Sequence, residues 1–186
     1  MYKKLDEQTL ARYCSQHDKM AEEELYNRYA VKVFALCRRY LRDEHRAKDL
    51  MRETLLQALD KMDSFRYAGE GSLYAWIRQI AINRAVNSLK RERWRTIFLD
   101  LRVLGDIPDP TGEEVETIPP EKLQEWISGL PPMRKAVFNL SVIDGYTHKE
   151  IAEILGISEK GSSGMLAKAK KQVKERIIEY RKGKEQ

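Results

Sequence analysis

Residues 147–158 read Thr-His-Lys-Glu-Ile-Ala-Glu-Ile-Leu-Gly-Ile-Ser, and this stretch decides the fold of the C-terminal part of the chain. Thr147 and Glu150 have the spacing of a capping box, so they predict a helix that begins here. Gly156 predicts a turn, because glycine adopts a left-handed backbone more easily than other residues. Ser158 can cap the helix that follows the turn. A short helix, a glycine turn and a second capped helix indicate a helix-turn-helix.

The predicted second helix of this unit carries amino and hydroxyl groups that can donate hydrogen bonds to DNA phosphates or base edges. Together with the caps, the candidate DNA-binding residues of this unit are Thr147, Ser158, Lys160, Ser162, Ser163, Lys168, Lys170 and Lys171. Gly161 and Gly164 weaken the same helix, since each costs about 1 kcal/mol relative to alanine. The alternative interpretation is a helical hairpin with a solvated basic face.

The N-terminal half shows apolar residues at helical spacing in three segments, residues 20–41, 43–62 and 72–91, and residues 1–17 predict an additional helix. A polar segment with two glycines, residues 65–71, interrupts the pattern before Ser72, which we expect to be the N-cap of the third long helix. The apolar residues that we expect to form the buried stripe of that helix are Leu73, Trp76, Ile77, Ile80, Ala81 and Leu89. These segments predict one helical bundle over residues 1–95.

Residues 96–120 differ from both flanks, because four prolines and two glycines interrupt any periodicity. Acidic residues also gather here: residues 100–125 hold eight acids and two basic residues. This composition indicates an acidic linker. Residues 121–186 then predict a second helical domain, in which Pro131 and Pro132 begin a helix that ends at Asp144 and Gly145. The predicted fold class is therefore all-α, with two helical domains joined by an acidic linker.

The chain of 186 residues has a formal net charge of +5, and its basic residues gather in residues 84–95 and after residue 157, which suits a polyanionic partner. Its two cysteines and three histidines make no metal-binding pattern, so we expect no metal, no cofactor and a reducing compartment. No signal peptide or apolar run of about 20 residues is visible, which predicts a cytoplasmic protein without membrane insertion. The sequence shows no catalytic constellation, and we expect no enzyme.

Four motifs, in the same order along the chain, resemble an extracytoplasmic-function (ECF) sigma factor, a minimal member of the bacterial sigma-70 family. They lie at residues 24–41, 47–53, 63–85 and 130–166. The first is similar to the first core helix of region two, and the second to the helix that docks on the clamp of RNA polymerase. The third resembles the segment that melts the promoter and reads the minus-ten element. The last resembles region four, which reads the minus-thirty-five element.

The resemblance implies a function in transcription regulation: a sigma factor that binds RNA polymerase core through its clamp and flap and directs promoter recognition. On the second motif it implies core-binding roles for Asp49, Leu50, Arg52 and Glu53. Asp49 and Glu53 are four residues apart and share a helix face, and Leu50 would supply an apolar contact. A solvated face with local ion pairs is the alternative. The family further implies promoter DNA and an anti-sigma factor as partners.

Opening a promoter requires a base to leave the stack, which costs a few kcal/mol. The polar segment over residues 65–72 could form a pocket for such a base, and the helix after it places amide and basic groups at spacings of three and four residues. Trp76 is more often a core residue than a stacking platform at such spacing. The candidate DNA-binding residues of region two are Phe65, Arg66, Ser72, Trp76, Arg78, Asn83, Arg84, Asn87, Lys90 and Arg91.

Two other functions fit parts of the sequence. A stand-alone helix-turn-helix regulator would bind duplex DNA without polymerase, usually as a dimer. An adaptor would bind polymerase or another protein and no longer read DNA. The acidic linker either threads toward the polymerase active site, as the resemblance implies, or is a flexible spacer.

Overall fold

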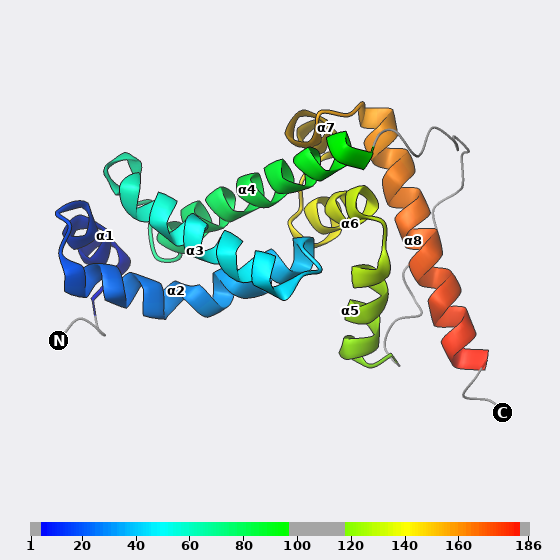
Figure 1. The fold of residues 1–186 in the computed structure, drawn as a ribbon, viewed down its shortest axis with the longest axis horizontal. Helices are drawn as coiled ribbons and strands as arrows, with labels where there is room; N and C mark the ends of the chain where they lie inside the picture. The colour runs from blue at the N-terminus through cyan, green and yellow to red at the C-terminus, as the bar shows by residue number, and fades with distance from the viewer. Residues whose placement is uncertain (1–4, 97–117, 183–186) are drawn as a thin grey trace. The chain divides into compact units, whose positions relative to one another are not determined.

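The computed structural model describes residues 5–96 and 118–182, and within these ranges it contains helices and no strand (Figure 1). The predicted all-α class is confirmed. The chain divides into two compact units, Met1–Ser88 and Leu89–Gln186. Most of the predicted acidic linker lies outside the described residues. Its last residue, Pro120, already belongs to a helix, because proline has the backbone angle that the first turn of a helix requires.

The first unit contains α1 (Glu7–Ser15), α2 (Lys19–Tyr40), α3 (Glu44–Asp60), the short 3₁₀ helix η2 (Met62–Ser64) and most of α4 (Ser72–Thr96), whose residues from Leu89 on belong to the second unit. An aspartate caps each of the first three helices. Asp6 accepts from the Thr9 amide at 2.8 Å, and Asp43 accepts from the Arg46 amide at 2.8 Å. These bonds favour the charged form, so they lower the pKa of both carboxyls.

The core of the first unit lies where α1 to α4 meet, and α2 and α3 lie side by side (Figure 1). Its fully buried large side chains come from all four helices: Leu10, Leu25, Val33, Tyr40, Leu55, Leu73, Ile77, Ile82 and Val86. On α4, the predicted stripe is only partly right, because Trp76 and Ile80 are half-buried. Ile82 and Val86 are buried beside the predicted positions, so α4 encloses a wider apolar face than a single stripe.

The first turn of α4 is not capped as the sequence predicts. The Ser72 hydroxyl accepts from the Ala68 amide at 3.3 Å, back in the preceding loop. The Leu73 amide instead donates to the Glu7 carboxylate of α1 at 3.0 Å. The predicted N-cap role of Ser72 is therefore wrong, since a local rule cannot identify an acceptor that lies 66 residues away.

The second unit contains α5 (Pro120–Gly129), α6 (Pro132–Phe138), the π-helical turn η3 (Asn139–Ile143), α7 (His148–Leu155) and α8 (Glu159–Lys182). The long α8 packs against α5, α6 and α7. The apolar residues buried in this unit include Leu130, Val137, Leu140, Ile151, Leu155, Leu166, Ala169 and Val173. The helix predicted from Pro132 to Ile143 is present, although its last turn is π-helical.

The helix-turn-helix predicted from residues 147–158 is confirmed. Thr147 and Glu150 form both bonds of the capping box at the start of α7. Gly156 ends that helix in the left-handed conformation, with φ of +65°. The Ser158 hydroxyl accepts from the Gly161 amide at 3.0 Å and so caps α8.

Both cysteines are buried and free. Burial raises the pKa of each thiol, Cys14 and Cys37, to about 12, which leaves them protonated and unreactive at neutral pH. No group of residues that could hold a metal ion occurs in residues 5–96 and 118–182. In the same part of the chain, no helix has the length and hydropathy to cross a membrane.

Two glycines of the helix-turn-helix give opposite expectations for alanine substitution. A Cβ at Gly164 would meet no atom within 4 Å, so Gly164→Ala should stabilise α8 by about 1 kcal/mol. Gly156→Ala should destabilise the unit by about 1–2 kcal/mol, because the residue has a left-handed backbone. Amide hydrogen exchange of α8 measures both effects. Equal protection in the two variants would contradict the prediction.

Candidate nucleic-acid interface

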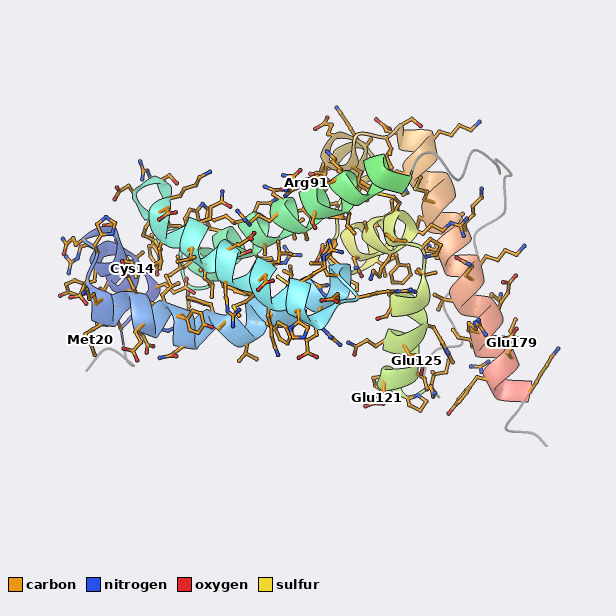
Figure 2. The ribbon with its side chains drawn as sticks, viewed as in Figure 1. Cys14, Met20, Arg91, Glu121, Glu125 and Glu179 are labelled. Carbon is orange, nitrogen blue, oxygen red and sulfur yellow. The ribbon has the colours of Figure 1, made fainter. Side chains whose placement is uncertain are left out.

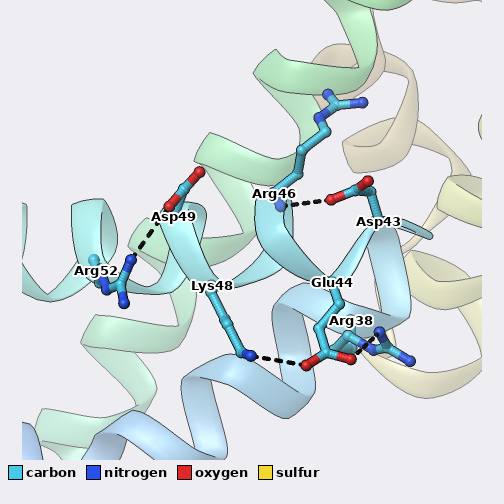
Figure 3. A network of polar contacts seen from close by, with 7 residues as sticks. All are labelled: Arg38, Asp43, Glu44, Arg46, Lys48, Asp49 and Arg52. Carbon is cyan, nitrogen blue, oxygen red and sulfur yellow. Dashed lines mark hydrogen bonds and ion pairs between the residues drawn. The ribbon is translucent and has the colours of Figure 1, made fainter.

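The exposed start of α3 carries a network of charged side chains (Figure 3). Glu44 accepts from Lys48 at 2.8 Å and pairs with Arg38 of α2 at 3.4 Å. Asp49 pairs with Arg52 at 3.4 Å, and about two thirds of each side chain is exposed. Exposed ion pairs of this kind contribute little to stability. Asp49 and Arg52 can therefore give up their mutual pair and bind charged groups of another protein instead.

Leu50 has a different environment from its charged neighbours. Its side chain is 7% exposed and belongs to the core of the first unit. It therefore has almost no surface to offer to a partner, whereas Leu56, further along α3, is 61% exposed.

Glu53 shares a helix face with Asp49, but its partner lies on another helix. It forms an ion pair with Arg84 of α4, and Arg84 also donates to the Gln57 side chain at 2.8 Å. The Arg84 Nε is buried without a hydrogen-bond partner among the described residues. A candidate polymerase contact and a candidate DNA contact are thus bonded to each other.

The segment over residues 65–71, called here the 65–71 loop, connects η2 to α4. Phe65 and Trp76 are both half-buried, and their rings pack with centroids 5.5 Å apart. The Arg66 guanidinium donates to the Asp63 and Phe65 carbonyls at 2.7 and 3.0 Å. Phe65 and Trp76 therefore pack against each other where the loop begins, and they do not offer two free rings for stacking.

Tyr67 is an exposed aromatic in the 65–71 loop that the sequence prediction missed. It is 42% exposed, and it lies between Arg66 and two glycines with positive φ, Gly69 at +110° and Gly71 at +86°. An aromatic ring exposed on a polar loop can stack on an unpaired base. The sequence held a signal for this exposure. Tyr67 lies in a glycine-containing break between helices, and a residue in such a break is more often exposed than its aromatic ring would suggest.

One side of α4 presents exposed polar groups at four-residue spacing: Asn83, Asn87 and Arg91, called here the α4 strip. Arg91 is labelled on α4 in Figure 2. Asn83 accepts from Gln79 at 3.1 Å. Lys90 is partly exposed beside the strip. The strip lies outside the hydrophobic core, as the sequence requires for contact with a nucleic-acid strand. Of the other candidates on this helix, Ser72 and Arg78 are half-buried.

The capping residues of the helix-turn-helix are exposed but already hydrogen-bonded. The Thr147 amide and hydroxyl both donate to Glu150 at 2.8 Å, and these bonds lower the pKa of the Glu150 carboxyl. Ser158 is occupied by its bond to the Gly161 amide. Their first effect is to shape the turn that presents α8.

The basic side chains of α8 differ in exposure. Lys160 and Ser163 are exposed near its N-terminus, and Lys171 is exposed 4.0 Å from Glu175. Lys168 and Lys170 are half-buried. The first two turns of α8 therefore offer an amino group and a hydroxyl group to solvent.

Ser162 does not lie on this exposed face. It is 0% exposed, and its hydroxyl lies 2.8 Å from His148 Nδ1 of α7. The predicted contact of Ser162 with DNA does not fit this position, because the side chain is enclosed between the two helices of the helix-turn-helix. Ser162 and Ser163 are adjacent in sequence but point in different directions from α8, so the first side chain is buried and the second is exposed.

Two family patterns match the chain: Sigma-70 region 2 over residues 25–95 and Sigma-70, region 4 over residues 121–173. The matches cover most of α2, α3 and α4, and the helix-turn-helix except for the last residues of α8. The chain belongs to the sigma-70 family.

Relatives within the sigma-70 family include the ECF RNA polymerase sigma-E factor of Haemophilus influenzae, 29% identical over 166 residues, which cover 83% of this chain and 86% of that protein. The ECF RNA polymerase sigma-E factor of Escherichia coli K12 is 28% identical over 166 residues, covering 83% and 85%. Among solved structures, the sigma factor RpoE in complex with the anti-sigma factor NepR from Bartonella quintana has a similar fold. Its TM-score is 0.51 at 16% identity, over 84% of this chain and 96% of that one.

The two adjacent serines of α8 should respond differently to alanine substitution. Ser162→Ala removes the bond to His148 and should lower the free energy of unfolding of the second unit by about 1 kcal/mol. Ser163→Ala should leave that free energy unchanged, since its side chain is exposed. Chemical denaturation of both variants makes the comparison. A larger loss from Ser163→Ala would refute the assignment of Ser162 to the interior.

Proposed function

We propose that the chain is an ECF sigma factor, which binds RNA polymerase core, recognises a two-part promoter and helps to open it. The observation that carries this proposal is the pair of matches to regions 2 and 4, in that order, on two helical units that both present polar groups suited to DNA. We infer no catalytic role for the chain itself. It supplies binding energy, and the polymerase performs RNA synthesis in the cytoplasm.

For the minus-thirty-five element, the second unit would place α8 in the major groove. Recognition helices contact base edges with residues near their N-terminus. Lys160 and Ser163 occupy that position and are exposed. Ser163 would then contact a base edge, while Lys160 and Lys171 would bind phosphate, since lysine acts as a point charge toward the backbone.

For the minus-ten element, the first unit would bind a strand that has left the duplex. An unstacked base entering the 65–71 loop could stack on Tyr67, next to the packed rings of Phe65 and Trp76. The α4 strip would continue along the same strand: asparagine amides offer a paired donor and acceptor to base edges, and Arg91 binds the backbone.

For the polymerase, the exposed start of α3 would provide the main contact. Asp49 and Arg52 are exposed and only locally paired, so basic and acidic groups of the clamp can replace each partner. Leu56 would supply the apolar contact in place of Leu50. We also propose that the chain contacts the polymerase flap and is bound by an anti-sigma factor. Its acidic linker would pass toward the polymerase active site.

Transcription from a library of random-sequence promoter duplexes tests the proposal. The full chain and RNA polymerase core are mixed with the library, and run-off transcripts are sequenced. Transcripts from a shared two-part sequence, made only when the chain is present, are the expected result. Specific binding of a duplex without core would support a stand-alone regulator instead. Binding of core without transcription would support an adaptor.

Charge reversal of Asp49 should weaken the complex with core polymerase about fivefold, because an attractive contact becomes a repulsive one. Glu53 is less suitable for this test, since reversing it would also place a lysine against Arg84. Glu23→Lys on α2 is the matched control, because Glu23 is exposed and outside the candidate set. Affinity is measured by fluorescence titration of labelled chain. Equal affinities of Asp49→Lys and Glu23→Lys would remove Asp49 from the interface.

Lys160→Ala should lower the slope of log affinity against log salt by about one, measured for promoter duplex bound to holoenzyme. The reason is that one phosphate contact releases about one counterion. Lys174→Ala is the control, an exposed lysine four turns further along α8. A slope reduced by Lys174→Ala and not by Lys160→Ala would show that the duplex lies elsewhere on the helix.

A further inference from the structure

α1 precedes the residues that match Sigma-70 region 2, yet it is bonded to the start of α4. One carboxylate makes the connection. Glu7 Oε2 accepts from the Leu73 amide at 3.0 Å, and Glu7 Oε1 accepts from the Tyr29 hydroxyl at 2.9 Å. A single side chain of α1 therefore joins α2 to α4.

Glu7 is itself held firmly in place. Asp6 caps α1, and Leu10 and Cys14 are buried on the inner side of α1. Arg28 of α2 donates to the Leu5 carbonyl at 2.9 Å, which ties the residues just before α1 to the bundle. Since its helix is fixed at the start and along its inner face, the Glu7 carboxylate occupies a defined position.

The partner of the second carboxylate oxygen is also well ordered. The Tyr29 ring is stacked on Tyr74 of α4, with centroids 6.0 Å apart and planes 13° apart, and Lys32 lies over the Tyr74 ring at 5.3 Å. Burial and the bond to Glu7 raise the pKa of the Tyr29 hydroxyl, so it keeps its proton and donates at neutral pH.

α1 contacts the elements on both sides of the 65–71 loop. Before the loop, α1 packs against η2. After the loop, the Leu73 amide is bonded to Glu7, and the Ser72 hydroxyl is turned back to the loop. A carboxylate at this position also complements the positive end of the α4 dipole. The loop itself contains two glycines with positive φ, so the separation of its ends depends on what anchors them.

We propose that Glu7 is a positioning residue for promoter opening. It holds the first turn of α4 against α1 and α2, and so sets the distance between the two ends of the 65–71 loop, where an unstacked base would bind. Glu7 acts through Leu73 and does not touch DNA. This inference rests on the proposed function. It assigns to α1, a helix outside the matched region, a part in the melting step rather than in the binding of duplex or core.

Holoenzyme made with the full chain tests the inference on two forms of a promoter recovered from the transcription library. One form is fully duplex, and the other is mismatched over the minus-ten element and therefore already open. Glu7→Ala should slow formation of the open complex on the duplex at least fivefold, and on the open form less than twofold. Glu7→Gln should restore most of the rate, because the amide oxygen can still accept from Leu73. Binding of core should not change.

Glu23→Gln on α2 is the matched control and should behave as the unaltered chain on both promoter forms. Equal slowing on the two forms, weaker binding of core, or no slowing at all by Glu7→Ala would each overturn the positioning role. If Glu7→Ala does not fold, as judged by circular dichroism, Glu7→Asp and Tyr29→Phe decide. Each should lower the ratio of duplex rate to open-form rate, and an unchanged ratio in both would overturn the role.

The two proposals fail in distinguishable ways. Absence of promoter-dependent transcription with the unaltered chain would refute the proposed function. Normal transcription by the unaltered chain, together with a normal duplex-to-open ratio in the Glu7 variants, would refute only the inference about α1.

Discussion

The organisation of the first unit depends on how α4 is held. Three other helices bond to it: α1 through Glu7 and Leu73, α2 through the stacked Tyr29 and Tyr74, and α3 through Glu53 and Arg84. Most apolar residues of α4, among them Leu73, Ile77, Ile82 and Val86, face this bundle and are buried. Only because one face is enclosed can the opposite face present the α4 strip in a defined direction. A helix with the same polar residues and no such support would not hold them in position for a strand of DNA.

The pair between Glu53 and Arg84 has a consequence for the proposed function. Each residue was a candidate for a different partner, Glu53 for polymerase and Arg84 for DNA, but each neutralises the other in the free chain. A basic group of the clamp that attracts Glu53 would compete with Arg84, and a phosphate that attracts Arg84 would compete with Glu53. If the proposed roles hold, binding at one surface would favour release of the other residue, and this linkage would be reciprocal. The pair offers a physical route by which core binding and strand binding support each other.

The second unit is built differently, mostly from short-range bonds. The capping box, the left-handed Gly156 and the Ser158 cap all join residues within four positions of one another. Longer-range bonds join the helices: His148 bonds to Ser162 and fixes α7 against α8, and Arg134 of α6 donates to Gln172 of α8 at 3.0 Å. Because Ser162 is used for this contact, the polar surface of α8 is narrower than its composition indicates. The exposed donors that remain near its N-terminus, Lys160 and Ser163, are correspondingly more important.

The sequence by itself determined the helical class, the helix-turn-helix and the order of the two family regions. The helical class and the helix-turn-helix follow from hydrophobic periodicity and from caps that form between near neighbours, and such interactions are present in the chain whatever its tertiary structure. The order of the two regions follows instead from the resemblance of four motifs to the sigma-70 family. Helix geometry also predicted that one face of a helix carries Asn83, Arg84, Asn87, Lys90 and Arg91. Of these, Asn83, Asn87 and Arg91 are exposed, whereas Arg84 and Lys90 are half-buried.

The tertiary structure decided which of the polar candidates are available. Ser162 and Ser163 have similar chemistry, and only packing against α7 buries the first. The cap of α4 comes from Glu7, and the partner of Arg84 is Glu53, and neither contact follows from local spacing. The physical reason is that a hydrogen bond or ion pair between distant residues forms only after the helices have packed, so its partners depend on the packed arrangement rather than on neighbouring residues.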